Sequence, residues 1–273
     1  MKKGISAWAF GTMPYAEIFR LAKEHGFEGV EPVLESCGEL SLESTKEDIL
    51  KIKKSAEENG IELYSLATGL YWQYALSAAD VDNRQHAFEI AEKQIEVAAL
   101  LGCDTILIIP GLVGSNAPDP YGEVDKRAEE AIHTLLPLAK KYNITLGVEN
   151  VWNGHLLSPI EMNSFINRFN DPLVGAYFDV GNVLQHGYPQ HWIDLLGDKI
   201  KKVHFKDYKK SIATIEGFCD LLAGDVDYFA VMQSLAKIGY DGWVTAEVFP
   251  YKSHNEIMLC HTSLAMDTIL GRK

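Results

Sequence analysis

Short apolar runs alternate with longer amphipathic segments along the whole chain. The runs have the length and flanks of buried strands, and the longer segments repeat apolar residues at the three- and four-residue spacing of a helix. This alternation is typical of parallel strands that are connected by crossover helices. The expected strands cover residues 5–8, 29–32, 61–66, 105–109, 145–149, 174–179, 200–204 and 243–247.

The segments between the strands predict helices over residues 15–24, 45–59, 83–101, 124–142 and roughly 254–270. In the third helix one face carries the residues expected to be buried, namely Ala87, Ile90, Ala91, Gln94, Ile95 and Ala98. Eight strands with helical crossovers predict an α/β fold, the (β/α)8 TIM barrel. No linker-like stretch marks a boundary, so residues 1–273 are expected to form a single domain.

Composition narrows the class of partner. A hydrophobic content of 47% in 273 residues is enough for one large core, and no stretch is apolar enough to suggest a membrane partner. The four cysteines show no CxxC spacing, which indicates reduced thiols and a cytoplasmic location. A formal net charge of −13 argues against nucleic acid and leaves a small neutral or singly phosphorylated molecule as the expected partner.

Four chemically active side chains each stand at the end of an expected strand: Glu149, Asp179, His204 and Glu247. A single charged residue in such a place is commonly only the point where the chain returns to solvent. In a parallel barrel, however, all strand ends of one polarity meet at one mouth. Four such residues on the last four strands therefore predict a metal site.

Three carboxylates and one imidazole suit a single divalent cation with octahedral geometry. Mn²⁺ is favoured, with Mg²⁺, Co²⁺ and Zn²⁺ as alternatives. About two coordination positions would stay open, enough for a sugar carbonyl oxygen and its neighbouring hydroxyl. The cation would polarise the carbonyl and stabilise the enediolate that forms when the adjacent carbon loses a proton. No glycine-rich phosphate motif points to a nucleotide instead.

The same strand ends carry a family resemblance, which extends over nearly the whole chain from Gly29-Val30-Glu31 onward. The chain is similar to the sugar phosphate isomerase/epimerase superfamily of xylose-isomerase-like barrels. Within that superfamily it is most similar to ketose 3-epimerases and to hexulose- or pentulose-phosphate 3-epimerases. The motifs that carry it are Gly147-Val148-Glu149-Asn150, Tyr177-Phe178-Asp179-Val180-Gly181-Asn182, Val203-His204-Phe205-Lys206-Asp207 and Gly242-Trp243-Val244-Thr245-Ala246-Glu247.

The resemblance implies one divalent cation held by Glu149, Asp179, His204 and Glu247. It also implies that Glu149 and Glu247 are the catalytic pair. One glutamate would remove the C3 proton of a ketose or ketose phosphate, and the other would deliver a proton to the opposite face. Inversion at carbon needs a donor and an acceptor on opposite faces, which two separated strand ends supply.

The chain departs from the family pattern at two places. Free-ketose 3-epimerases usually have a histidine where Asn182 stands and an arginine within the region of residues 206–210, here Lys206-Asp207-Tyr208-Lys209-Lys210. Asn182 forms hydrogen bonds but does not titrate near neutral pH, which weakens the assignment to a free-sugar epimerase. Lys206 is expected to contact a hydroxyl or a phosphate of the substrate.

Further substrate-binding residues are expected near other strand ends. Trp8 and Trp152 offer apolar faces to a sugar ring, as do the nearby Tyr71, Trp72 and Phe249. Glu31 closes the second strand and His155 lies in the loop after the fifth, where both could bind hydroxyl groups. With Asn182 and Lys206, the predicted substrate-binding set is Trp8, Glu31, Trp152, His155, Asn182 and Lys206.

Other functions use the same frame. A polyol or inosose-type dehydratase would share the enolate step and then lose a hydroxyl, and an aldose–ketose isomerase would move a proton between C1 and C2. A non-catalytic sugar-binding barrel would bind without exchange. An abasic-site endonuclease needs extra histidines where this chain has Thr68-Gly69, Pro110-Gly111 and Asn182. A homo-oligomer, dimer or tetramer, is expected, although no stretch marks its interface.

Overall fold

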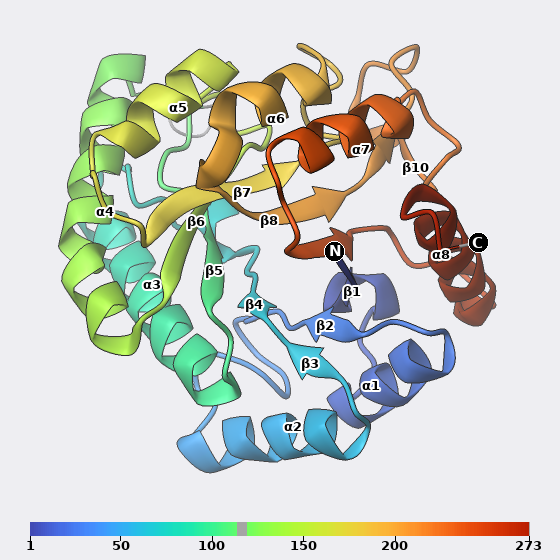
Figure 1. Cartoon of the computed structure of the whole chain (residues 1–273). Coiled ribbons are helices and arrows are strands. Elements are labelled where there is room, and N and C mark those ends of the chain that lie inside the picture. Colours follow the sequence, from blue (N-terminus) through green and yellow to red (C-terminus); the bar gives the residue numbers. More distant parts are fainter. Residues whose placement is uncertain (114–118, 273) are drawn as a thin grey trace.

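The computed structural model describes residues 1–113 and 119–272, and its centre is a parallel barrel (Figure 1). In the ring, hydrogen-bonded neighbours follow the order β3 (Glu62–Leu63), β2 (Gly29–Glu31), β1 (Lys2–Ser6), β11 (Trp243–Ala246), β8 (Ile200–Phe205), β7 (Val174–Asp179), β6 (Thr145–Glu149), β5 (Thr105–Ile108) and β4 (Ser65–Leu66). β3 and β4 are two halves of the expected third strand, separated by Tyr64. The ring therefore closes through one residue, and the predicted TIM barrel is confirmed.

In the part of the chain that the structure describes, eight α-helices surround the barrel (Figure 1). They are α1 (Tyr15–Glu24), α2 (Lys46–Glu58), α3 (Val81–Leu101), α4 (Tyr121–Tyr142), α5 (Pro159–Asn167), α6 (Pro189–Leu196), α7 (Tyr228–Lys237) and α8 (Asn255–Ile269). The five helices predicted from periodicity are all present, and α1 has the predicted bounds. None of the described helices combines the length and apolarity that crossing a bilayer requires.

Several short elements lie in the loops of the barrel. Residues 1–113 and 119–272 contain four 3₁₀ turns: η1 (Ala7–Phe10), η2 (Leu70–Trp72), η3 (Gly197–Lys199) and η4 (Ile215–Gly217). A small antiparallel pair, β9 (Asp207–Tyr208) with β10 (Phe218–Cys219), follows β8. The apolar pattern did not predict this pair, because two-residue strands are too short to show an alternation.

Local sequence signals explain where several helices begin and end. Thr45 and Asp48 form a capping box at the start of α2, where each side chain accepts a hydrogen bond from the other's backbone N–H. Helix α3 ends at Gly102, whose φ of 87° is the left-handed conformation that glycine adopts without a Cβ penalty. The glycines at 26, 60 and 239 also have positive φ, as expected after a helix.

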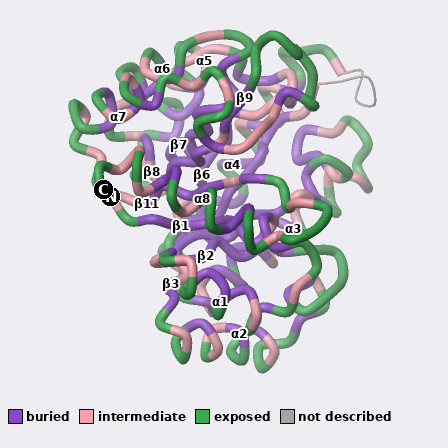
Figure 2. The backbone as a smooth tube through the Cα atoms, turned by 90° about the vertical axis from the view of Figure 1, so that its right-hand side faces the viewer, coloured by how far each residue is buried: buried purple, intermediate pink, exposed green. Residues whose placement is uncertain are grey.

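The core lies inside the ring of strands and between the ring and the helices. Every residue of β5 and β7 is buried, and α3 buries the face that its periodicity predicted. Figure 2 shows buried segments through the interior and exposed segments on the outer helices. This frame holds the carboxyl ends of all the strands at one mouth.

Tyr64 is the residue at which the ring closes. Its ring stacks on Trp243 of β11, with centroids 3.9 Å apart and an interplanar angle of 7°. Its hydroxyl lies 2.8 Å from Thr245 Oγ1, and it fills the space that a Cβ at Gly4 of β1 would need. The side chain thus connects the split third strand to β1 and β11 across the interior of the barrel.

We predict that Tyr64→Ala lowers the free energy of unfolding by about 3–5 kcal/mol, because it leaves a cavity where the ring stacks on Trp243. Tyr64→Phe keeps the stacking and removes only the hydrogen bond to Thr245, so it should cost about 1 kcal/mol. Denaturant unfolding of both variants measures the difference. Equal stability of the two would show that the ring stacking does not hold the closure.

Candidate metal and substrate site

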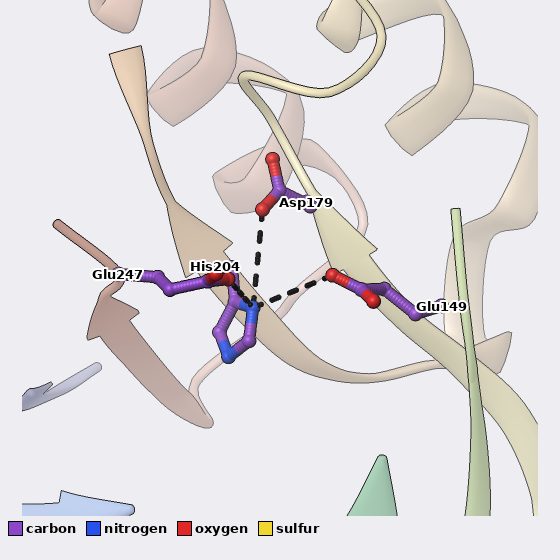
Figure 3. Close-up of side chains that lie close together, drawn as sticks. All are labelled: Glu149, Asp179, His204 and Glu247. Carbon is purple, nitrogen blue, oxygen red and sulfur yellow. Dashed lines mark ion pairs between the residues drawn. The ribbon is translucent and has the colours of Figure 1, made fainter. Parts of the chain in front are cut away.

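The four strand-end residues meet at one side of the barrel mouth (Figure 3). One ligand atom from each lies within 4.8 Å of the others. From His204 Nδ1, Glu247 Oε2 is 2.7 Å away, and Glu149 Oε1 and Asp179 Oδ2 are each 3.8 Å away. In Figure 3, Glu149 and Glu247 approach the imidazole from opposite sides, with Asp179 between them.

Strand register explains this convergence. Asp179 of β7 stands beside His204 of β8, and Thr245 of β11 stands on the other side of the same histidine. Glu149 ends β6 and is paired with Tyr177 of β7. The ends of neighbouring parallel strands therefore place the side chains, so that no long loop is needed to assemble them.

The donor set fits a divalent cation. Asp179 Oδ2, His204 Nδ1 and Glu247 Oε2 are buried, and among the described residues none of them has a hydrogen-bond partner. Buried polar atoms are otherwise nearly always satisfied. Three carboxylate groups and one imidazole nitrogen that face a common point are the ligands that Mn²⁺, Mg²⁺ or Co²⁺ accept. These buried, unsatisfied atoms are therefore candidate metal ligands.

Burial and neighbouring charges shift the pKa values of the three carboxyl groups in the cluster. Burial raises the pKa of Glu149 to about 7, and the nearby Glu247 carboxylate adds to the rise. Burial also raises the pKa of Asp179. For Glu247, burial is outweighed by Lys206 and His204, which hold its pKa well below the usual range. A cation would stabilise the ionised form of all three.

Lys206 lies over the cluster as an internal counter-charge. Its Nζ is 2.9 Å from Glu247 Oε1 and 3.3 Å from Asp179 Oδ2. Burial lowers the pKa of Lys206, but the neighbouring carboxylates outweigh that effect and raise it. Its ammonium group is therefore charged and held at the edge of the candidate metal site.

Glu31 differs from the expectation that it contacts the substrate. It is fully buried behind His204, where its Oε1 accepts the Nε2–H of the imidazole at 3.0 Å. Its other oxygen accepts hydrogen bonds from Ser65 and Tyr177. Because the Glu31 oxygen accepts this hydrogen bond, the imidazole carries its proton on Nε2, and Nδ1 faces the cluster. Glu31 is thus placed to orient a ligand, as carboxylates behind metal-bound histidines do.

Two asparagines form hydrogen bonds with Asp179 and hold it in position. The Asn182 backbone N–H donates to Asp179 Oδ1 at 2.8 Å, and its amide donates to Asn150 O at 3.0 Å. Asn150 in turn accepts from the Asp179 N–H and donates to the Asp179 carbonyl, both at 2.8 Å. Sequence reasoning missed Asn150, Ser65 and Tyr177. Only Asn150 carried a signal, its position directly after Glu149.

A cavity of about 710 Å³ opens above the cluster. Trp8, Trp152, Asn182 and Lys206 all line it, as expected of substrate-binding residues, and the Trp152 indole N–H donates to Asn182 O at 2.8 Å. The remaining lining residues are Thr68, Gly69, Trp72, Leu107, Ile109, Glu149, Val151, Ile215, Phe218, Glu247, Val248 and Phe249. Tyr71 is not among them, because its hydroxyl bonds Gln94 within the core.

His155 also differs from the expectation. The loop after β6 turns at Gly154, with a φ of 71°, and carries the imidazole away from the cavity. The side chain is buried against Phe165, and its Nε2 lies 3.1 Å from Asp125 of α4. Burial lowers the pKa of His155. The residue therefore packs the barrel wall against α4 and α5, outside the substrate cavity.

The fold and the cluster define a TIM barrel with a candidate metal centre at the face where such barrels place their active sites. Residues 19–261 match the model of the xylose isomerase-like TIM barrel family, and the chain belongs to that family.

Three similar proteins are two relatives found by sequence and one solved structure with the same fold. The chain is 28% identical over 253 residues to a putative L-ribulose-5-phosphate 3-epimerase of Haemophilus influenzae, covering 90% of this chain and 88% of the relative. It is 27% identical over 141 residues to an inosose dehydratase of Bacillus licheniformis, covering 45% and 46%. A D-psicose 3-epimerase crystallised with D-fructose has the same fold, with a TM-score of 0.81, 19% identity and coverage of 99% and 100%.

We predict that Glu31→Gln weakens Mn²⁺ binding by about 10–100-fold, because a carboxylate that orients a ligating histidine is replaced by a neutral amide. Isothermal titration of the chelator-treated protein with Mn²⁺ measures the affinity. Glu62→Gln, a surface substitution in β3, is the matched control and should bind as the parent chain does. Parental affinity in Glu31→Gln would contradict the positioning role.

Proposed function

We propose that the chain is a divalent-metal-dependent epimerase of ketoses or ketose phosphates that removes and returns a proton at C3. The observation that carries this proposal is the placement of Glu149 and Glu247 on opposite sides of the candidate metal site, below one cavity. The match to a putative 3-epimerase supports it. The predicted cytoplasmic location and homo-oligomer stay predictions.

Each residue then has a defined task. The cation, when bound by Glu149, Asp179, His204 and Glu247, supplies Lewis acidity to the substrate carbonyl. One glutamate accepts the C3 proton and the other donates a proton to the opposite face, and their roles exchange with the direction of reaction. Lys206 forms an ion pair with Glu247 and lines the cavity, where it would hold this glutamate in position and contact the substrate.

A dehydratase is the second candidate, because the inosose dehydratase similarity spans part of the chain. It would use the same proton abstraction and then expel a hydroxyl group in place of reprotonation. A product lighter by one water distinguishes it by mass. The abasic-site endonuclease has less support. The described residues contain one cluster that could hold a metal ion, and Thr68 and Gly69 line the cavity where a nuclease would need histidine ligands.

We predict that Glu149→Gln and Glu247→Gln each lower C3 exchange by about 10²–10⁴-fold, because each removes a proton acceptor and keeps an oxygen ligand. The measurement is incorporation of deuterium at C3 when the Mn²⁺-loaded protein is incubated with ketoses and their phosphates in D₂O. Glu92→Gln, on the exposed face of α3, is the control. Near-normal exchange in either variant would remove that residue from the mechanism, and label at C1 or C2 would indicate an isomerase.

We predict that Lys206→Ala lowers kcat/KM by about 10–100-fold, because a charge-assisted hydrogen bond to a buried carboxylate is worth about 1.5–3 kcal/mol. Lys209→Ala is the control, since Lys209 is exposed and does not line the cavity. An unchanged kcat/KM in Lys206→Ala would end the assignment of Lys206 to the substrate site.

A further inference from the structure

The described residues that line the cavity offer no unpaired cationic side chain to a phosphate group. Among the described residues, Lys206 is the only lysine, arginine or histidine that lines it. Its ammonium is already paired with Glu247 and Asp179, and its side chain is only 12% exposed. Residues 114–118, which the structure does not describe, contain no basic residue. A phosphate dianion here would face Glu149 and Glu247, and among the described side chains only the already paired Lys206 could compensate its charge.

Four backbone donors of the loop after the seventh barrel strand, β8, are also occupied. Many TIM barrels bind phosphate at the loops after the seventh and eighth strands. After β8, the buried Asp207 carboxylate accepts four backbone N–H groups, from Tyr208 at 2.8 Å, Leu222 at 2.9 Å, and Gly224 and Val226 at 3.1 Å. The chain's own carboxylate thus fills the anion position that this loop creates.

The two lysines that follow do not restore a phosphate site. Lys209 and Lys210 are both exposed, and neither lines the cavity. Lys210 Nζ lies 5.5 Å from the ring centroid of Tyr188, at the start of α6. Lys206, the lysine expected to contact a hydroxyl or a phosphate of the substrate, does line the cavity, but its ammonium group is already paired with Glu247 and Asp179.

Large apolar side chains surround the mouth of the cavity. Trp72 of η2 is 48% exposed, and Ile215 of η4 and Phe249 after β11 are each 64% exposed. They belong to three separate segments and line one cavity together with Trp8 and Trp152. Exposed apolar groups gathered around a pocket mark a surface that a ligand covers.

The size of the cavity agrees with a ligand larger than one sugar. A volume of 710 Å³ lies within the range of roughly 300–1,000 Å³ that holds drug-sized ligands. A single monosaccharide placed over Glu149 and Glu247 would occupy the floor and leave the apolar rim uncovered.

Resting on the proposed function, we propose that the substrate is an unphosphorylated keto sugar that carries a second ring. The keto sugar lies over the four-residue cluster, and the apolar face of the second ring packs against Trp72, Ile215 and Phe249. The proposed reaction stays the removal and return of the proton at C3 of the keto sugar. The outer ring adds binding energy remote from the reacting carbon.

Three matched probes share one fructose unit and differ only at O6: D-fructose, fructose 6-phosphate and isomaltulose, which carries a glucosyl ring there. Calorimetric binding to the Mn²⁺-loaded protein is measured for each, together with deuterium incorporation at C3 in D₂O. We expect isomaltulose to exceed fructose by at least tenfold in affinity and in kcat/KM. Fructose 6-phosphate should fall at least tenfold below fructose.

The two measurements separate this inference from the proposed function. The expected order in binding without C3 exchange would support the second-ring substrate and overturn the epimerase. Exchange that is fastest with fructose 6-phosphate would support the epimerase and overturn the inference. Equal binding of fructose and isomaltulose, or no binding of any probe, would also overturn the inference.

Variants of the rim residues provide an independent test of the inference. Trp72→Ala and Phe249→Ala should each lower the isomaltulose-to-fructose ratio of kcat/KM by at least fivefold. Phe229→Ala, on α7 with a side chain that is 74% exposed and outside the cavity, should leave the ratio unchanged. If the rim variants instead dissociate an oligomer in gel filtration and keep the ratio, a second copy of the chain covers the rim and the inference is wrong.

Discussion

The candidate site depends on an excess of negative charge at the mouth of the barrel. Glu149, Asp179 and Glu247 converge on His204 in an environment where two of the three carboxylates are almost fully buried. Lys206 offsets part of the charge, yet atoms of Asp179, His204 and Glu247 keep no hydrogen-bond partner among the described residues. Burying charged groups with unsatisfied atoms is costly, and a bound cation would offset that cost.

The interior of the barrel holds this cluster in place. Glu31 of β2 connects His204 of β8 with Ser65 of β4 and Tyr177 of β7, so four strands share one buried hydrogen-bond network. Below it, Tyr64 joins the split strand to β1 and β11. Because both Glu31 oxygens accept hydrogen bonds in this network, the imidazole is held in one orientation. The same strands therefore provide both the stability of the barrel and the geometry of the site.

Much of this could be predicted from the sequence, because strands buried on both faces appear as short apolar runs and parallel strand ends must converge. The bounds of β6 and β7 and the meeting of the four residues followed from that rule. The roles of Glu31 and His155 did not, since a strand-end or loop residue can face the axis or the outside and the sequence does not show which. The role of Asp207 could not be predicted either, because three of its four backbone donors, Leu222, Gly224 and Val226, come from a later loop that returns to it.

The central claim is that one divalent cation binds among the four strand-end residues. Anomalous diffraction at the manganese edge, from crystals soaked in Mn²⁺, tests it directly. The account predicts a single strong peak within coordination distance of Glu149, Asp179, His204 and Glu247, and none in a crystal of Asp179→Ala grown and soaked alike. No peak at this position, or a peak bound to other residues, would contradict the account.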